Sequence, residues 1–223
     1  MSIELDFGAI LIEWPQLLKG VGWTLFLTLS STVIGVSVGS FFSWIQWQKK
    51  SIGIHVVSLY VESIRNTPFI IQLFFIFFGL PSLGIKLSAE WASVVAMSIN
   101  LGAYSTEIIR AGVEAIDRGQ IEAAYTLALS RAQTFKRVIL PQAYKKIWPS
   151  LVSQIIIVML GSSVCGQVST EELSYAANLI QSRNFRAFEA FIIAATIYLA
   201  LCILLRSVLN RLGQRYLFGT RRG

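Results

Sequence analysis

Residues 20–48 read GVGWTLFLTLSSTVIGVSVGSFFSWIQWQ, twenty-nine positions between Lys19 and Lys49 without one charged side chain. A second stretch of twenty-four uncharged residues, IWPSLVSQIIIVMLGSSVCGQVST, lies between Lys146 and Glu171. A helix of about 20 apolar residues is long enough to cross a hydrocarbon layer about 30 Å thick. Each of the two stretches therefore predicts a membrane-spanning helix.

The composition of the whole chain also indicates a membrane protein. Of its 223 residues, 54% are hydrophobic and only 14% are charged, which excludes a disordered tail, and its two cysteines exclude a disulfide-rich scaffold. We expect an all-α polytopic membrane protein with about five transmembrane helices. The expected spans are Val21–Trp47, Ile54–Leu80, Glu90–Ile109, Ile147–Val168 and Ala187–Leu205. In the first span, Gly35 and Gly39 lie four residues apart, a spacing that predicts close contact with another helix.

Lysine and arginine are unevenly distributed between the expected loops. Loops rich in these residues stay on the cytoplasmic side of a membrane. With the N-terminus outside, fourteen of the nineteen basic residues fall in inner segments and four in outer segments. This bias predicts an N-out, C-in topology and explains the net charge of +7 without nucleic acid. Residues 1–19 would be a periplasmic segment, 20–212 the transmembrane domain and 213–223 a basic cytoplasmic tail.

The cytoplasmic loop between the third and fourth spans, residues 112–146, is too long for a simple connection. Gln120–Leu129 is rich in Ala and Leu, and Ser130 is a good N-cap for a second short helix, which we expect to end at Pro141. The apolar side of these helices has no lipid to face, so we expect it to face another protein. A hairpin packed on its own spans is the alternative. A DNA-binding helix-turn-helix is disfavoured because both ends are tethered to the membrane.

Several ordered motifs resemble those of one transporter family. Three short motifs look like the EAA loop of the membrane subunits of bacterial ABC importers: Glu122-Ala123-Ala124, Leu127-Ala128 and Ile139-Leu140-Pro141-Gln142-Ala143. Further motifs are similar to those of the polar amino-acid permeases of that superfamily: Arg65-Asn66-Thr67-Pro68, Gln72-Leu73-Phe74-Phe75, Phe78-Gly79-Leu80-Pro81, Gly102-Ala103-Tyr104, Glu107-Ile108-Ile109-Arg110 and Gly119-Gln120. The resemblance runs from about Gly20 to Leu212.

The resemblance implies a type I ABC importer permease subunit in the bacterial inner membrane that forms half of the path for an amino acid. The implied partners are a cytoplasmic ATPase dimer, a second permease subunit, a periplasmic amino-acid-binding protein and membrane lipid. ATP and Mg²⁺ would bind to the ATPase, so we expect no cofactor, metal site or catalytic residue in this chain. In agreement, the sequence has no Gly-Lys dipeptide and hence no phosphate-binding G-x-x-x-x-G-K-[ST] loop.

By the same resemblance, six residues of the loop are expected to couple the permease to the ATPase. They are Glu122, Ala123, Ala124, Leu127, Ala128 and Pro141. The small alanines would let a short helix lie in a groove of the ATPase, where Glu122 would find a basic or hydrogen-bonding partner. The family usually has Gly where Ala128 stands. This departure matters because Ala resists the left-handed backbone conformation that Gly accepts.

Polar side chains within the spans predict the substrate site, because placing them in a membrane is costly. Asn100, Tyr104 and Glu107 follow the i, i+4, i+7 spacing of one helix face in the third span. Arg65, Pro68 and Gln72 are expected to share a face of the second span. The candidate substrate-binding residues are Arg65, Gln72, Asn100, Tyr104, Glu107, Ser162 and Ser163. The alternative for Arg65 and Glu107 is a purely structural role as hydrogen-bonding groups between helices.

The fourth span departs from the resembling family at Leu160-Gly161-Ser162-Ser163-Val164. The family typically has Lys followed by Asp or Asn before Thr-Ser-Leu at this point. The missing acidic or amide group implies either a substrate that is not cationic or a heterodimer in which the other permease carries the working site. We favour the heterodimer.

A self-contained carrier driven by an ion gradient is the main alternative function, with Glu107 and Arg65 as its ion or proton groups. Many such carriers consist of two repeats, and five spans show no evident duplication. A membrane-anchored scaffold would explain the long loop but not the polar groups within the spans. Co-purification of an ATPase would distinguish the importer from both alternatives.

Overall fold

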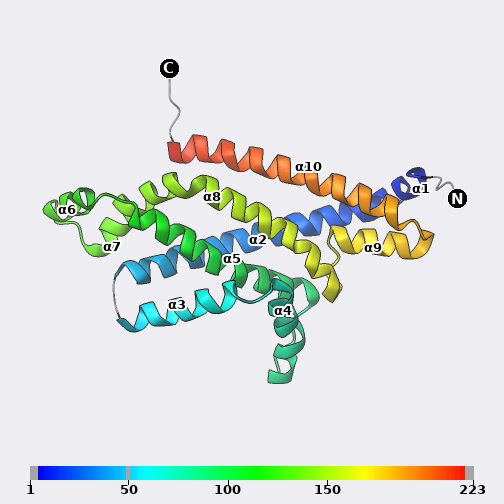
Figure 1. Ribbon diagram of the computed structural model, residues 1–223, viewed down its shortest axis with the longest axis horizontal. Coiled ribbons are helices and arrows are strands. Elements are labelled where there is room, and N and C mark those ends of the chain that lie inside the picture. The colour runs from blue at the N-terminus through cyan, green and yellow to red at the C-terminus, as the bar shows by residue number, and fades with distance from the viewer. Residues whose placement is uncertain (1–4, 49–50, 219–223) are drawn as a thin grey trace, which may run out of the picture. The chain divides into compact units, whose positions relative to one another are not determined.

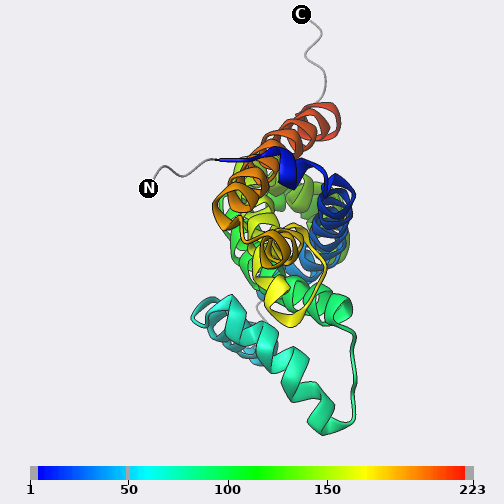
Figure 2. The same ribbon diagram turned by 90° about the vertical axis from the view of Figure 1, so that its right-hand side faces the viewer.

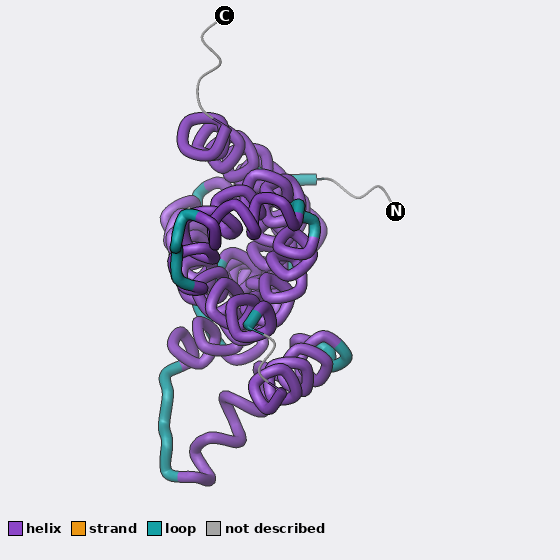
Figure 3. The backbone as a smooth tube through the Cα atoms, turned by 90° about the vertical axis from the view of Figure 1, so that its left-hand side faces the viewer, coloured by secondary structure: helices purple, strands orange, loops and turns teal. Residues whose placement is uncertain are grey.

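The computed structural model describes residues 5–48 and 51–218, and every regular element of these residues is a helix (Figures 1 and 3). The expected all-α fold is therefore confirmed. The α-helices are α1 (Gly8–Leu11), α2 (Trp14–Trp47), α3 (Ser51–Arg65), α4 (Phe69–Phe74), α5 (Ala89–Glu114), α6 (Arg118–Thr126), α7 (Arg131–Thr134), α8 (Leu140–Gly161), α9 (Leu173–Asn184) and α10 (Ala187–Gly213). Short π- and 3₁₀-helical turns follow some of them: η1 (Phe75–Gly79), η2 (Leu80–Leu83), η3 (Phe135–Ile139), η4 (Ser162–Val168) and η5 (Gln214–Phe218).

The described residues form two compact units. Unit 1 comprises those within Met1–Thr32, Pro68–Ser98 and Ile156–Leu205. Unit 2 comprises those within Val33–Thr67, Ile99–Ile155 and Arg206–Gly223. The long helices α2, α5, α8 and α10 each contribute one part to unit 1 and the other part to unit 2.

Among the described residues, three helical stretches are long and apolar enough to cross a membrane: Trp14–Trp47, Arg131–Val168 and Ala187–Phe218. They contain the first, fourth and fifth expected spans. Ile52–Arg65 and Phe69–Leu83 would add a fourth if the two helices form one span. The third expected span lies in α5, whose 26 residues suffice in length, but polar side chains such as Asn100 make it less apolar. The number of spans and their orientation stay predictions.

The second expected span, Ile54–Leu80, is not one continuous helix. α3 ends at Arg65 and α4 begins at Phe69, after Pro68 with a ψ of 137°. Proline lacks the N–H that a continuing helix needs and disfavours helical backbone in the residue before it. The prediction that Arg65, Pro68 and Gln72 share one helix face is therefore wrong. Arg65 belongs to unit 2 and Gln72 to unit 1.

The core of unit 1 forms where α9 meets the first part of α10 and the start of the chain (Figure 2). Leu173, Ala176, Ala177 and Ile180 recur at the spacing of one helix face, and all four are buried. They pack with Ile10, Leu17, Ala190 and Ala194. The small side chains of Ala176 and Ala177 let α9 pack closely on α10. Glu172, at the N-terminal end of α9, is fully buried.

The core of unit 2 joins α5, η3 and α8. Its buried members are Ile109, Val113, Ile116, Phe135, Ile139, Ala143 and Ile147. The predicted helix contact at Gly35 and Gly39 is confirmed, because a Cβ on Gly39 would lie 2.6 Å from Ser105 Cβ of α5. Ser43, one helical step further, donates a hydrogen bond of 3.0 Å to the Thr106 carbonyl. The second part of α2 therefore packs directly on α5.

The long loop at residues 112–146 contains two short helices, as expected, but the second does not end at Pro141. α7 continues through η3 into α8, so that one helical stretch runs from Arg131 to Val168. Pro141 is the second residue of α8. Proline is tolerated in the first turn of a helix because the N–H that it lacks needs no partner there. α8 begins directly after the π-helical turn η3, so Pro141 lies in the first turn of α8.

Candidate functional site

The α6–α7 loop, defined here as residues 117–130, is held in shape by caps at the start of each helix. Asp117 caps α6 by accepting a hydrogen bond from the Gly119 N–H at 2.7 Å. Ser130 caps α7, which confirms its predicted role. Its Oγ accepts from Gln133 N at 3.3 Å, while its own N–H donates to Gln133 Oε1 at 2.9 Å. This reciprocal capping box satisfies two N–H groups that the helix leaves unpaired.

The C-terminal end of α6 is closed by a Schellman motif. The Ala128 N–H donates to the Tyr125 carbonyl at 2.9 Å, and the Leu129 N–H donates to the Ala124 carbonyl at 3.1 Å. This motif places one residue in the left-handed region, where glycine is preferred. Here that residue is Ala128, with a φ of 56°. The concern that Ala128 stands where a glycine is expected therefore has a structural basis, and Ala adopts the conformation at an energetic cost.

The six expected coupling residues differ in exposure. Glu122, Ala123, Leu127, Ala128 and Pro141 are exposed, and the Leu127 side chain is 76% accessible. Ala124 is only 3% accessible and faces the chain itself. α6 thus presents a surface with a carboxylate and an apolar side chain, whereas Ala124 fixes the helix in place.

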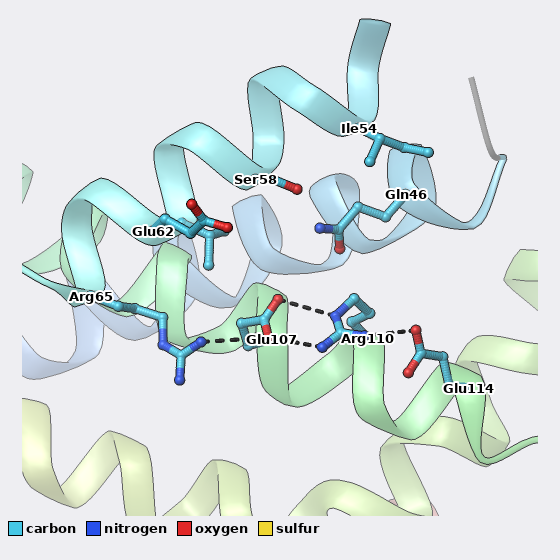
Figure 4. Close-up of a pocket in the computed structure, with 9 residues that line it drawn as sticks. Gln46, Ile54, Ser58, Glu62, Arg65, Glu107, Arg110 and Glu114 are labelled. Atoms are coloured by element: carbon cyan, nitrogen blue, oxygen red, sulfur yellow. Dashed lines mark hydrogen bonds and ion pairs between the residues drawn. The ribbon is translucent and has the colours of Figure 1, made fainter. Parts of the chain in front are cut away.

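A pocket with a volume of about 620 Å³, called the charged pocket below, lies in unit 2 between α2, α3 and α5 (Figure 4). Its lining residues are Gln46, Ile54, Ser58, Val61, Glu62, Arg65, Glu107, Arg110 and Glu114. Three carboxylates and two guanidinium groups face this volume, so the lining carries one net negative charge. The dashed lines of Figure 4 show that most of these charges form one connected network.

Glu107 is the centre of the network. Arg110 donates two hydrogen bonds to the Glu107 carboxylate, from Nε to Oε1 at 3.1 Å and from Nη2 to Oε2 at 3.0 Å. Arg110 Nη1 also donates to Glu114 Oε1 at 2.7 Å. Arg65 of α3 reaches Glu107 Oε2 at 3.4 Å, and its guanidinium carbon lies 5.5 Å from the centre of the Tyr104 ring. Helical spacing on α5 places these groups on one side of the helix.

The structure brings together only part of the predicted substrate-binding set. Arg65 of α3 contacts both Tyr104 and Glu107 of α5, and Asn100 also lies on α5. Three others belong to unit 1: Gln72, Ser162 and Ser163. The Ser162 and Ser163 hydroxyls donate to the carbonyls of Met159 and Leu160, at 2.6 and 2.7 Å. Both hydroxyls thus satisfy local backbone groups.

Sequence reasoning missed Glu172, a fully buried carboxylate in unit 1. Glu172 caps α9, accepting hydrogen bonds from Ser174 N at 2.9 Å and Tyr175 N at 2.7 Å. The Tyr198 hydroxyl of α10 donates to the same carboxylate. A Cβ on Gly166 would lie 2.8 Å from Glu172 Oε1, so glycine leaves room for it. The one signal in the sequence was an acidic residue directly before the apolar pattern of α9, although Glu is not a preferred N-cap.

Burial raises the pKa of the Glu172 carboxyl above its usual value. The three hydrogen-bond donors act in the opposite direction, since they favour the ionised form, but burial has the larger effect. No basic side chain pairs with Glu172 among the ion pairs of the described residues. Glu172 is therefore a buried structural cap of α9.

Comparison with known proteins identifies the family. Residues 32–217 match the family model described as "Binding-protein-dependent transport system inner membrane component". The chain is 35% identical over 204 residues to the arginine transport system permease protein ArtQ of Bacillus subtilis, covering 91% of this chain and 93% of ArtQ. It is 34% identical over 215 residues to the glutamine transport system permease protein GlnP of Escherichia coli, covering 96% and 98% of the two chains.

A solved structure described as an amino acid ABC transporter with histidines is similar in sequence and in fold. Its TM-score with this chain is 0.85 at 36% identity, and the match covers 96% of this chain and 100% of that one. The expected resemblance is thus confirmed by sequence and structure over nearly the whole chain. This protein belongs to the binding-protein-dependent transport system inner membrane component family, as a permease of the amino-acid ABC transporters.

Proposed function

We propose that this chain is the permease subunit of an ATP-driven amino-acid importer and that α6 couples it to a separate ATPase. A cytoplasmic ATPase dimer would bind ATP and Mg²⁺, and a periplasmic binding protein would deliver the amino acid. Family membership supports this division of labour, because the relatives are themselves permease subunits. A self-contained carrier is not favoured by these relatives.

The proposal that α6 couples the permease to an ATPase rests on the exposed surface of α6. A short helix fixed by caps at both ends can transmit a rigid-body displacement, because its own hydrogen bonds need not change when a partner moves it. Buried Ala124 packs α6 against the rest of unit 2, while Glu122, Ala123 and Leu127 remain available to a partner. Tyr125 and Leu127 are both exposed outside the expected spans, and together they offer apolar area that a protein partner would cover.

Reversal of the charge at Glu122 tests the coupling surface. When the variant chain is combined with its partners in proteoliposomes, Glu122→Lys should abolish substrate-stimulated ATP hydrolysis while the chain remains folded, because Glu122 is exposed. Glu171→Lys is the matched control: it reverses the same kind of charge at a partly exposed site in unit 1 and loses only an ion pair with Lys19. Unchanged stimulation in Glu122→Lys would contradict the proposal, as would an equal loss in the control.

We further propose that the charged pocket of unit 2 contributes to the amino-acid path. A free amino acid carries an ammonium and a carboxylate, and the pocket offers both carboxylates and guanidinium groups to bind them. Arg65 makes a single ion-pair contact of 3.4 Å with Glu107, so most of its N–H donors face away from that carboxylate. The roles of Gln72, Asn100, Ser162 and Ser163 remain part of the same proposal.

Glu107 and Glu114 both pair with Arg110, so variants of these two residues can be compared to test whether Glu107 acts in transport. Glu107→Gln should reduce amino-acid uptake at least tenfold, because Glu107 joins Arg65 to Arg110. Glu114→Gln should leave uptake within about twofold, since the Glu114 side chain is 64% exposed and Arg110 is its one ion-pair partner among the described residues. Uptake of radiolabelled amino acids into proteoliposomes measures both. Uptake by Glu107→Gln that equals uptake by the wild type would exclude the pocket from the path.

The second permease subunit is proposed to be a different, homologous chain. The argument rests on Leu160-Gly161-Ser162-Ser163, which lacks the acidic or amide residue of the resembling family. The two relatives described above are named for arginine and for glutamine, so their names do not fix one amino acid for this chain. Mass spectrometry of the transporter purified from its native membrane would show one permease chain or two.

A further inference from the structure

The C-terminal end of α10 carries an unusual run of charge. From Ala190 to Gly223 the sequence contains five arginines and no acidic residue. Three of these arginines lie within the described residues: Arg206, Arg211 and Arg215. All three are exposed, and none takes part in the ion pairs found among the described residues. A site with this charge favours an anionic partner.

Exposed apolar side chains lie next to the arginines along α10 and the π-helical turn η5 that follows it. Val208, Leu212 and Tyr216 follow one another at four-residue intervals and are 42%, 43% and 72% accessible. Arg211 and Arg215 each precede a member of this row by one residue, and so form a second row beside it. The arrangement offers an apolar row for an acyl chain and a basic row for a headgroup. The Arg215 guanidinium carbon lies 5.7 Å from the Tyr216 ring centre.

The other side of this helix end packs on α8 within unit 2. A Cβ on Gly213 would lie 2.2 Å from Trp148 Nε1 of α8, so the two helices touch at this glycine. Gly213 is buried, whereas its neighbours Leu212 and Gln214 are exposed. The packed side therefore leaves the two rows facing outward. This contact fixes the position of the helix end that carries Arg211 and Arg215.

We propose that Arg211 and Arg215, with the adjoining row Val208, Leu212 and Tyr216, bind an anionic phospholipid such as phosphatidylglycerol. The guanidinium groups hold the phosphodiester, because arginine donates paired hydrogen bonds to phosphate oxygens. The apolar row lies along an acyl chain, and Tyr216 marks the boundary between hydrocarbon and water, where tyrosine is enriched. The proposal concerns lipid only and is independent of the transport function.

Native mass spectrometry of the full-length chain in detergent tests this site directly, with phosphatidylglycerol and phosphatidylcholine titrated in parallel. Each arginine near an anionic lipid surface strengthens binding about fivefold, so Arg211→Gln/Arg215→Gln should bind phosphatidylglycerol about 25-fold more weakly than the wild type. Phosphatidylcholine binding should not change. Lys136→Gln/Arg137→Gln is the matched control, since it removes two exposed positive charges from η3 and should bind like the wild type.

Three results would overturn the proposal. The first is equal phosphatidylglycerol binding by the wild type and the arginine double variant, and the second is an equal loss in the control. The third is displacement of the lipid by excess glycerol phosphate, which would mean that the site recognises a soluble phosphate. If the glutamine variant does not fold, Arg211→Lys/Arg215→Lys keeps the charge, and it should still prefer phosphatidylglycerol over phosphatidylcholine. Loss of that preference would also contradict the assignment.

Discussion

The turn before α9 in unit 1 and the α6–α7 loop in unit 2 are both helix junctions with side-chain caps, but they use their carboxylates differently. Glu172 is fully buried and receives two backbone N–H groups and the Tyr198 hydroxyl. Glu122 is exposed on the surface of α6, where capping is left to Asp117 and Ser130. The carboxylate of the first junction is therefore buried in the fold, and that of the second is exposed on the surface.

This difference shows which carboxylate stabilises the fold and which is available to a partner. A buried acceptor with three donors cannot be removed without leaving those donors unpaired. An exposed carboxylate can be exchanged at little cost to the fold, so any large effect of its removal must come from a lost interaction with another molecule. Measurements of stability and of function should therefore separate the two junctions.

The largest effect on stability is expected from Glu172→Ala. The loss of the cap and of the acceptor for Tyr198 should destabilise the chain by about 3 kcal/mol. Glu122→Ala should change stability by less than about 0.5 kcal/mol, as is usual for an exposed side chain. Thermal unfolding in detergent, followed by circular dichroism, compares the two variants. Similar shifts for both would remove the distinction between a buried and an exposed junction.

A smaller gain is expected from Ala128→Gly at the end of α6. Ala128 holds a left-handed backbone at φ 56°, which costs an L-residue about 1 kcal/mol more than glycine. The variant should therefore raise the unfolding midpoint by a few degrees and leave the Schellman hydrogen bonds in place. Ala123→Gly is the control, because it lies inside α6 at ordinary helical geometry and should lower the midpoint. A decrease in both variants would show that position 128 is not strained.

The smallest effect is a pH dependence at Glu172. Because burial raises its pKa, the folded chain holds this proton more tightly than the unfolded chain. The contribution of Glu172 to stability is then present at low pH and is lost as the pH rises from the unfolded value, near 4.5, through the raised folded value. The unfolding midpoint of the wild type minus that of Glu172→Gln should fall over this range. A difference that grows with pH would mean that the donors outweigh burial.

Much of the fold could be predicted because membrane spans depend on composition over long stretches. The uncharged run at residues 20–48 and the cap at Ser130 both appear as expected. Proline effects were less predictable: Pro68 interrupts a span that looked continuous, whereas Pro141 is absorbed into α8. A proline is accommodated in a helix when it lies in the first turn, where its missing N–H needs no partner. Where that first turn begins depends on the backbone hydrogen bonds of the folded chain.

The candidate site was only partly predictable for a similar reason. The sequence shows the spacing that places Tyr104 and Glu107 on one face of a helix. The Arg65–Glu107 contact across two helices and the enclosure of Glu172 depend on tertiary packing, which periodicity does not contain. The burial of Ala124 was missed because all three residues of Glu122-Ala123-Ala124 were assigned to one partner surface.

The central claim, that α6 joins this permease to a separate ATPase, is tested most directly by co-purification. The tagged wild-type chain and Glu122→Lys would be isolated from native membranes in mild detergent, and their partners identified and assayed for ATP hydrolysis. The account predicts that an ATPase accompanies the wild type and is lost from Glu122→Lys. A wild-type chain that comes alone, hydrolyses no ATP and still transports an amino acid under an ion gradient would contradict it.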